Sequence, residues 1–167
     1  SILRQTHQDW ELIIEDGLSK DETLSIVKEY EPKCQGRMRI FSEKDNGLYD
    51  AMNRGIARAT GDVIGILNSD DFYYDENVLS EINNAMENQP IDCVYGNLMF
   101  VDADYTGRTV RLWKGSQHEK GAFLRGWHPA HPTFYARREC YEMLGSFNTK
   151  YAVSADFELM LRFIEVA

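Results

Sequence analysis

The sequence has few cysteines, a shortage of basic residues and no long hydrophobic segment. Its three cysteines lie far apart with no Cys-x-x-Cys pair, so neither a disulfide framework nor a zinc site is signalled. Lys and Arg total 18 against 27 Asp and Glu, which argues against a nucleic-acid partner because phosphate backbones are gripped through clustered basic side chains. No apolar run approaches the roughly 18 residues of a spanning helix, and the start lacks a signal-peptide pattern. We therefore expect a soluble chain in a reducing, cytoplasmic compartment.

The residues that are present suit one globular domain over 1–167. The chain is 43% hydrophobic and 12% aromatic, enough for a core. Short apolar runs alternate with helical patterns in the first half. Strands are predicted at 11–15, 37–41 and 62–68, and helices at 21–30, 48–59 and 76–88. This order predicts an α/β fold, with a mainly parallel sheet flanked by helices.

The pattern changes in the second half of the chain. Two or three strands within 92–113, separated by a turn at 104–107, predict a small antiparallel part. A loop rich in Gly and His follows and leads to a strand near 133–136. A short helix then ends at Gly145, and a last helix starts at residue 154.

Carboxylates follow two of the predicted strands. Asp70 and Asp71 come directly after the third strand, and Asp16 follows the first. In open parallel sheets, ligands bind beyond the carboxyl ends of the strands. Adjacent carboxylates repel each other unless a cation or a donor compensates, so a divalent ion and a diphosphate are natural partners. The alternative is that these residues open loops and cap the helices that follow, and each motif taken alone favours it.

Three segments together resemble the family 2 glycosyltransferases, which have the GT-A (nucleotide-diphospho-sugar transferase) fold. They are SILRQTHQDWELIIEDGLSKDET, EKDNGLYDAMNRGIARATGDVIGILNSDDFY and HPTFYARRECYEMLGSFNTKYAVSADFELMLRF. They run in the family's order over nearly the whole chain, and only 90–127 is less diagnostic. The resemblance implies metal-dependent, inverting transfer of a sugar from a nucleotide-diphosphate donor to a hydroxyl acceptor, with Mg²⁺ or Mn²⁺ as cofactor, in polysaccharide or glycolipid synthesis.

The resemblance also implies roles for single residues. Asp16 matches the nucleobase contact, Asp70 and Asp71 match a DXD-like motif with Asp70 toward the ribose and Asp71 on the metal, and Asp156 matches the general base. A sugar hydroxyl is too weak an acid to attack unaided, so a carboxylate must take its proton. Ala155 stands where the family usually has Glu. Other groups must therefore position the base.

Further candidates come from the segments around these residues. In EKDNGLYDAMNRG, Asn46 and Asn53 match the family's spacing, and Asn46 or Lys44 is expected to reach the donor. His128 and His131 are candidates for metal, diphosphate or acceptor contacts, with a structural role as the alternative. Arg162 is either a diphosphate contact or a structural ion-pair partner.

Compared with the family, the chain is expected to be truncated at both ends, with the first strand missing and a central strand edge exposed. Its nucleotide-binding half is placed at about 1–90 and its acceptor and catalytic half at about 91–167. The expected partners are the nucleotide-sugar donor and a sugar or lipid-linked glycan acceptor, without nucleic acid. Peripheral association with the inner membrane face and a homo-oligomer stay open. A nucleotidyltransferase of similar fold and a non-catalytic carbohydrate-binding subunit are the alternative functions.

Overall fold

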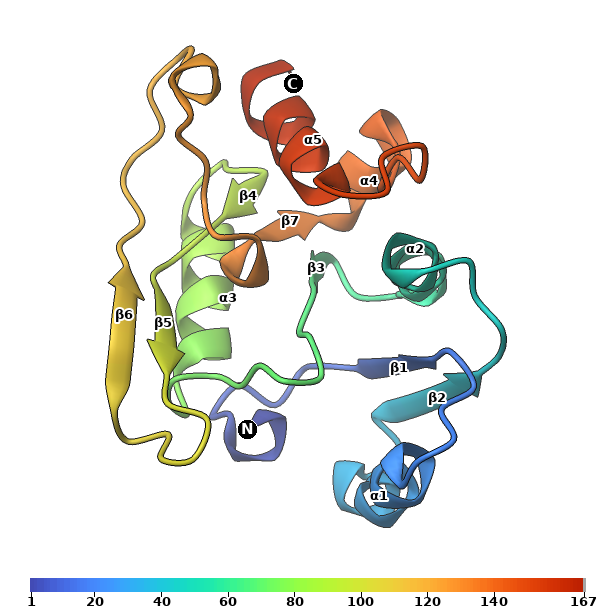
Figure 1. Cartoon of the computed structure of the whole chain (residues 1–167). Helices are drawn as coiled ribbons and strands as arrows, with labels where there is room; N and C mark the ends of the chain where they lie inside the picture. Colours follow the sequence, from blue (N-terminus) through green and yellow to red (C-terminus); the bar gives the residue numbers. More distant parts are fainter. Residues whose placement is uncertain (167) are drawn as a thin grey trace.

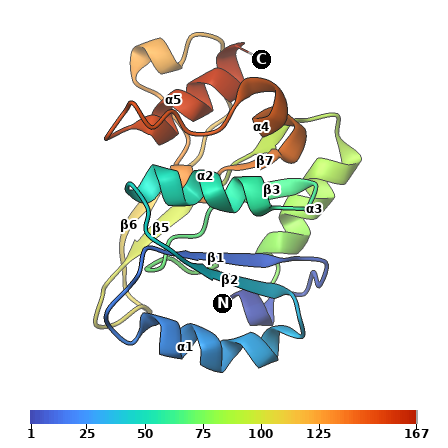
Figure 2. The same cartoon turned by 90° about the vertical axis from the view of Figure 1, so that its right-hand side faces the viewer.

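The computed structural model describes residues 1–166, in which helices pack around three small sheets (Figure 1). Strands β1 (Leu12–Asp16) and β2 (Met38–Ser42) pair in parallel, with Asp16 opposite Ser42. Helix α1 (Thr23–Tyr30) connects them and lies on one face of the pair, and α2 (Leu48–Arg58) lies on the other face (Figure 2). The predicted β-α-β unit at the start of the chain is confirmed.

A second sheet forms around strand β7 (Tyr135–Arg137). Strands β3 (Val63–Gly65) and β4 (Cys93–Val94) pair with its two sides, both antiparallel, with Ile64 and Cys93 opposite Ala136. Ala136 is fully buried because it occupies the centre of this sheet. The strand predicted near 133–136 thus joins the second half of the chain to the first.

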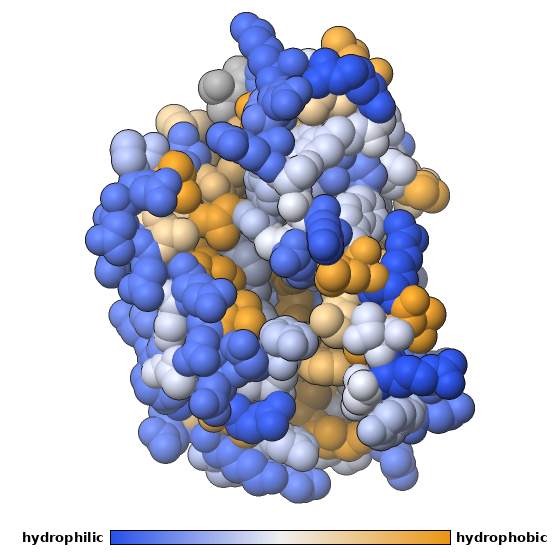
Figure 3. Space-filling view, turned by 90° about the vertical axis from the view of Figure 1, so that its left-hand side faces the viewer, coloured by the Kyte–Doolittle hydropathy of each residue, from blue (hydrophilic) through white to orange (hydrophobic). Residues whose placement is uncertain are grey.

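The remaining elements include the helices around this sheet, a third, two-stranded sheet and short turns. The bounds are α3 (Val78–Asn88), β5 (Leu98–Val101), β6 (Thr109–Trp113), α4 (Arg138–Leu144), α5 (Ala155–Leu161) and its π-helical continuation η5 (Arg162–Val166); short 3₁₀ turns are η1 (Ile2–Arg4), η2 (Glu31–Cys34), η3 (Phe123–Arg125) and η4 (His131–Thr133). Strands β5 and β6 form the predicted antiparallel hairpin. The face that carries β6 is mostly hydrophilic around a hollow bordered by hydrophobic side chains (Figure 3).

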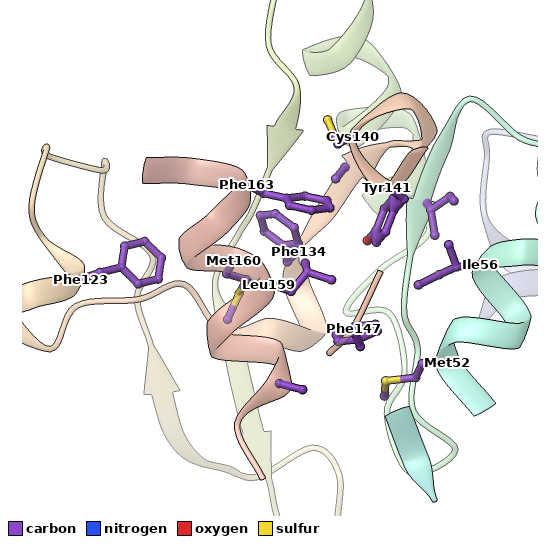
Figure 4. Close-up of a cluster of buried hydrophobic side chains, with 13 residues drawn as sticks. Met52, Ile56, Phe123, Phe134, Cys140, Tyr141, Phe147, Leu159, Met160 and Phe163 are labelled. Carbon is purple, nitrogen blue, oxygen red and sulfur yellow. The ribbon is translucent and has the colours of Figure 1, made fainter. Parts of the chain in front are cut away.

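The largest hydrophobic core lies between α5, α4, β7 and α2 (Figure 4). Leu159 and Ala155 of α5 are fully buried, and Met52 and Ile56 extend the core from α2. Met52 and Ile56 are four residues apart, so they share one helix face. Helix α2 therefore lies between the β1–β2 pair and the α4–α5 layer (Figure 2). It links the two halves of the chain.

Strand β3 does not join the β1–β2 pair, although the sequence predicts one sheet. Strands β1 and β3 instead border a groove of about 990 Å³, lined by residues that include Leu12, Ile13, Val63 and Ile64. Each strand uses one edge for pairing, β1 with β2 and β3 with β7. Within residues 1–166, their other edges have no strand partner and border this groove. In this part of the chain, no helix combines the length and the hydrophobicity needed to cross a membrane.

Candidate active site

The loop after β3 holds Asp71 in a tight turn. The backbone N–H of Asp71 donates to the Asn68 carbonyl at 3.1 Å, and the Asn68 amide Nδ2 donates to Asp71 Oδ2 at 2.9 Å. Asp70 is exposed and lines the groove between β1 and β3. The turn thus fixes the Asp71 carboxylate and leaves Asp70 open to solvent.

The far end of this loop is fixed by the first residues of the chain. Gln5 is 1% exposed; its Nε2 donates to the Asp75 carbonyl at 2.6 Å, and its Oε1 accepts the Leu79 N–H at 3.0 Å. The latter bond satisfies one of the free N–H groups at the start of α3. The neighbouring Thr6 N–H donates to the Glu76 carbonyl at 2.7 Å. Sequence reasoning assigned no role to these residues, because their partners lie about 70 positions away.

Asp156 lies in the first turn of α5, which begins after Ser154 in a left-handed conformation (φ 68°). The Tyr49 hydroxyl of α2 donates a hydrogen bond to Asp156 Oδ1 at 3.0 Å. Burial, and then the adjoining Asp156 carboxylate, raise the pKa of Tyr49. The phenol therefore keeps its proton at neutral pH and acts as the donor. Tyr49 was missed by the sequence analysis, although it stands in the singled-out segment DNGLYDAMNRG.

His131 lies within the electrostatic reach of both Asp156 and Asp71. Burial lowers the pKa of His131, while the negative charges of Asp156 and then Asp71 oppose that effect. The imidazole is therefore neutral at neutral pH, and its ring packs edge-on against Phe147 at a centroid distance of 5.6 Å. Asp71, His131 and Asp156 come from three separate segments, and the fold brings both carboxylates near enough to His131 for their charges to act on it.

Asp16 lies at the end of β1, as predicted, and is 6% exposed. Its carboxylate accepts the Ser19 N–H at 3.2 Å and the Ser42 hydroxyl at 2.6 Å. These hydrogen bonds from Ser19 and Ser42 lower the pKa of Asp16, so its charge is retained near neutral pH. These bonds hold the turn that follows β1, and the nucleobase contact of Asp16 stays a prediction.

Lys44 and Asn46 lie in the exposed segment between β2 and α2. The backbone N–H and the side-chain amide of Asn46 both donate to Asp50 Oδ2, at 2.9 and 3.3 Å. The Lys44 carbonyl accepts from Arg54 at 2.9 Å. These contacts order the start of α2, while the Lys44 side chain remains exposed.

His128 and Arg162 are engaged in the protein's own packing. The His128 ring packs edge-on against Trp113 and Phe157, at centroid distances of 5.1 and 5.5 Å. Arg162 makes a two-pronged ion pair with Glu158 at 2.9 Å and also donates to backbone carbonyls at the end of α4. The ion-pair alternative for Arg162 is therefore confirmed.

The candidate metal ligands, Asp71 and His131, would fill only part of the coordination shell of a metal ion. Within residues 1–166, no group of three His, Cys, Asp or Glu side chains is placed to hold a metal ion. Asp71 nevertheless offers carboxylate oxygens, and the neutral His131 lies near it. Magnesium is commonly bound by one or two carboxylates, with water and substrate phosphates completing the shell. This donor set fits a metal shared with a diphosphate better than one enclosed by protein ligands alone.

Comparison with known protein sequences gives a consistent result. The family model described as glycosyl transferase family 2 matches residues 1–144. A "PGL/p-HBAD biosynthesis glycosyltransferase" of Mycobacterium bovis (strain BCG / Pasteur 1173P2) is 34% identical over 163 residues, which are 97% of this chain and 61% of that protein. The chain thus spans about three-fifths of the length of this relative.

Solved structures share the fold at low sequence identity. The mannosyltransferase PcManGT from Pyrobaculum calidifontis, in complex with GDP-Man and Mn²⁺, superposes with a TM-score of 0.68 and 18% identity, over 97% of this chain and 46% of that one. S. aureus TarS 1-349 in complex with UDP superposes with a TM-score of 0.70 and 16% identity, over 96% of this chain and 48% of that one. The arrangement of β-strands and helices is that of the GT-A fold.

Proposed function

The chain belongs to glycosyl transferase family 2, and on this basis we propose that it catalyses metal-dependent transfer of a sugar from a nucleotide-diphosphate donor, with inversion at the anomeric carbon. The acceptor is a hydroxyl group of a sugar or of a lipid-linked glycan. His131 lies within reach of the charges of both Asp71, the metal-ligand candidate, and Asp156, the candidate proton acceptor, and this observation supports the proposal.

The donor would bind at the edge where β1, β2 and β3 end. In this proposal Asp16 accepts a hydrogen bond from the nucleobase, Asp70 binds the ribose, and Lys44 or Asn46 reaches the diphosphate. Asp16 is ionised and held by Ser19 and Ser42, so it offers a fixed acceptor. Mg²⁺ or Mn²⁺, held by Asp71 with His131 beside it, would offset the negative charge that grows on the diphosphate.

Asp156 would act on the acceptor. The acceptor oxygen attacks the anomeric carbon while the bond from that carbon to the diphosphate oxygen breaks, and the electron pair leaves with the diphosphate. The hydroxyl proton passes to the Asp156 carboxylate, which is the general-base step that a weakly acidic alcohol requires. Attack opposite to the leaving group inverts the anomeric centre, so one displacement completes the transfer.

The direct test is turnover of the full-length protein with manganese and a panel of UDP, GDP and dTDP sugars. We expect release of the nucleoside diphosphate, with slow donor hydrolysis when acceptor is absent, and a product of inverted anomeric configuration by NMR. Pyrophosphate release from a nucleoside triphosphate would instead favour a nucleotidyltransferase. Glycan binding that survives loss of Asp70, Asp71 and Asp156, without any transfer, would favour a carbohydrate-binding subunit.

A further inference from the structure

Asp156 depends on a hydrogen bond from another element for its orientation. Tyr49 Oη lies 3.0 Å from Asp156 Oδ1 and retains its proton, so it is the donor. Within residues 1–166, the second oxygen, Oδ2, accepts no hydrogen bond. One oxygen of the carboxylate is therefore anchored and the other is free to receive a proton.

The anchor is itself held rigidly. The Tyr49 ring stacks on Phe147 with a centroid distance of 5.4 Å and an interplanar angle of 29°. Asn53, one turn further along α2, binds both backbone groups of Phe147 at 2.8 Å. Figure 4 shows Phe147 beside Met52, which, like Asn53, belongs to α2. Tyr49 therefore has little freedom to turn away from Asp156.

The residue before Asp156 gives it no polar support. Ala155 is fully buried and has a methyl side chain, so it cannot orient the adjoining carboxylate. The family's usual Glu is absent here, and some other group must take its place. The observed donor to Asp156 comes from α2, 107 residues earlier in the chain.

We propose that Tyr49 is a positioning residue that holds the Asp156 carboxylate in the orientation in which it accepts the acceptor's proton. This inference rests on the proposed function, in which Asp156 is the general base. A carboxylate that loses a hydrogen-bond donor is both less well oriented and more easily protonated. Loss of the Tyr49 hydroxyl must therefore act through Asp156 and on the chemical step.

The test is a double-mutant cycle on the full-length protein, with wild type, Tyr49→Phe, Asp156→Asn and the double variant compared. Tyr49→Phe keeps the ring that stacks on Phe147, so it removes only the hydroxyl. We expect kcat to fall about tenfold, as for loss of one hydrogen bond to a charged group, with donor KM within about twofold of wild type. In the Asp156→Asn background the same substitution should change kcat by less than about twofold.

The pH profile provides a second readout. The acidic limb of the kcat profile should move to higher pH in Tyr49→Phe, because the carboxylate is then protonated more easily. Tyr95→Phe is the matched control. It also removes a hydroxyl, which donates to the Ser116 carbonyl at 3.2 Å and accepts the His118 N–H at 3.0 Å, and it should keep the wild-type kcat and pH profile.

The outcomes separate the two claims. Two results would overturn the positioning role of Tyr49 and leave the assignment of Asp156 as base in place. One is an equal loss of kcat when Tyr49→Phe is made in the wild-type and in the Asp156→Asn backgrounds. The other is a Tyr49→Phe variant with wild-type kcat and pH profile and only a lower melting temperature. Wild-type turnover by Asp156→Asn would overturn the assignment of the base, and the role of Tyr49 with it.

Discussion

Asn53 on α2 and the backbone of Phe147 exchange two hydrogen bonds, each 2.8 Å long, across 94 residues of sequence. The asparagine side chain thereby acts as a substitute strand partner for the segment between α4 and α5. This segment leads to Asp156, so the bonds fix its approach to the candidate active site. Asn53 was singled out by its spacing in the sequence, and its role here is structural.

Substitution of Asn53 by Ala should destabilise the protein by about 2 kcal/mol, because it leaves the N–H and the carbonyl of Phe147 without their partner. Urea unfolding measures the change. Asn88→Ala is the matched control: Asn88 bonds the Asn84 carbonyl on the exposed end of α3, and its loss should cost less than about 0.5 kcal/mol. Equal effects of the two substitutions would contradict the proposed importance of the α2 contact.

Gly65 of β3 is required for packing. A methyl group at this position would come within 2.0 Å of a Tyr135 ring carbon, and Tyr135 is buried. Gly65→Ala should therefore cost about 1 to 3 kcal/mol through forced displacement of the ring. Gly96 has open space at the same position, so Gly96→Ala should be close to neutral by the same urea titration. If Gly65→Ala left the free energy of unfolding unchanged, the Tyr135 ring or the backbone of β3 would have to move aside without cost, and the packing role of Gly65 would be wrong.

Asp16 should make folding stability depend on pH. Hydrogen bonds from Ser19 and Ser42 hold the pKa of Asp16 in the folded protein below its value in the unfolded chain. The ionised carboxylate therefore stabilises the fold fully at pH values above the unfolded pKa, and this stabilisation is lost as the pH falls through the folded pKa. Ser42→Ala removes one donor, raises the pKa of Asp16 and should cost about 1 kcal/mol at pH 7. The difference from wild type should shrink below about pH 4, where the unfolded carboxyl is protonated.

Urea unfolding at pH 7 and pH 3 measures this effect. Ser25→Ala is the control, because the Ser25 hydroxyl bonds the Glu22 carbonyl and no carboxylate. Its cost should be the same at both pH values. A pH-independent cost for Ser42→Ala would mean that the hydroxyl does not act on the charged form of Asp16.

Asp71→Asn should weaken manganese-dependent binding of the nucleotide sugar at least about tenfold, because an amide lacks the charge that attracts a hard cation. Folding stability should barely change, since the Asn oxygen can still accept from Asn68. Calorimetric titration of the full-length protein with and without manganese measures the binding. Asp104→Asn, in the exposed turn between β5 and β6, is the charge-matched control. Unchanged affinity in Asp71→Asn would leave Asp71 with a turn-forming role only.

Local patterns in the sequence predicted most elements to within one or two residues. Strand β1 was found as a short apolar run, and helix α2 was found because Leu48, Met52 and Ile56 recur at the spacing of a helix. Strand β3 is shorter than predicted and ends at Gly65. The apolar run continues to Leu67, but only its first part pairs with β7. Hydrophobicity marks burial, and it does not reveal where a partner strand ends.

The relations between distant segments could not be read from local pattern. The division of the predicted sheet at the β1–β3 groove depends on which strand edges meet, and side-chain periodicity carries no information on this point. The bond from Tyr49 to Asp156 likewise joins residues 107 positions apart. Asp71, His131 and Asp156 were identified from sequence motifs, but the effect of both carboxylate charges on His131 became visible only in the fold.

The measurement that tests the central claim most directly is the turnover of Asp156→Asn in the full-length protein, with donor affinity measured alongside. The substitution preserves shape and can still accept from Tyr49, but it cannot take the acceptor's proton. We predict that kcat falls by about 10²- to 10⁴-fold while donor affinity stays close to wild type. Sugar transfer at a near wild-type rate would contradict the account, and the search for the base would then move to His128, His131 and Glu158.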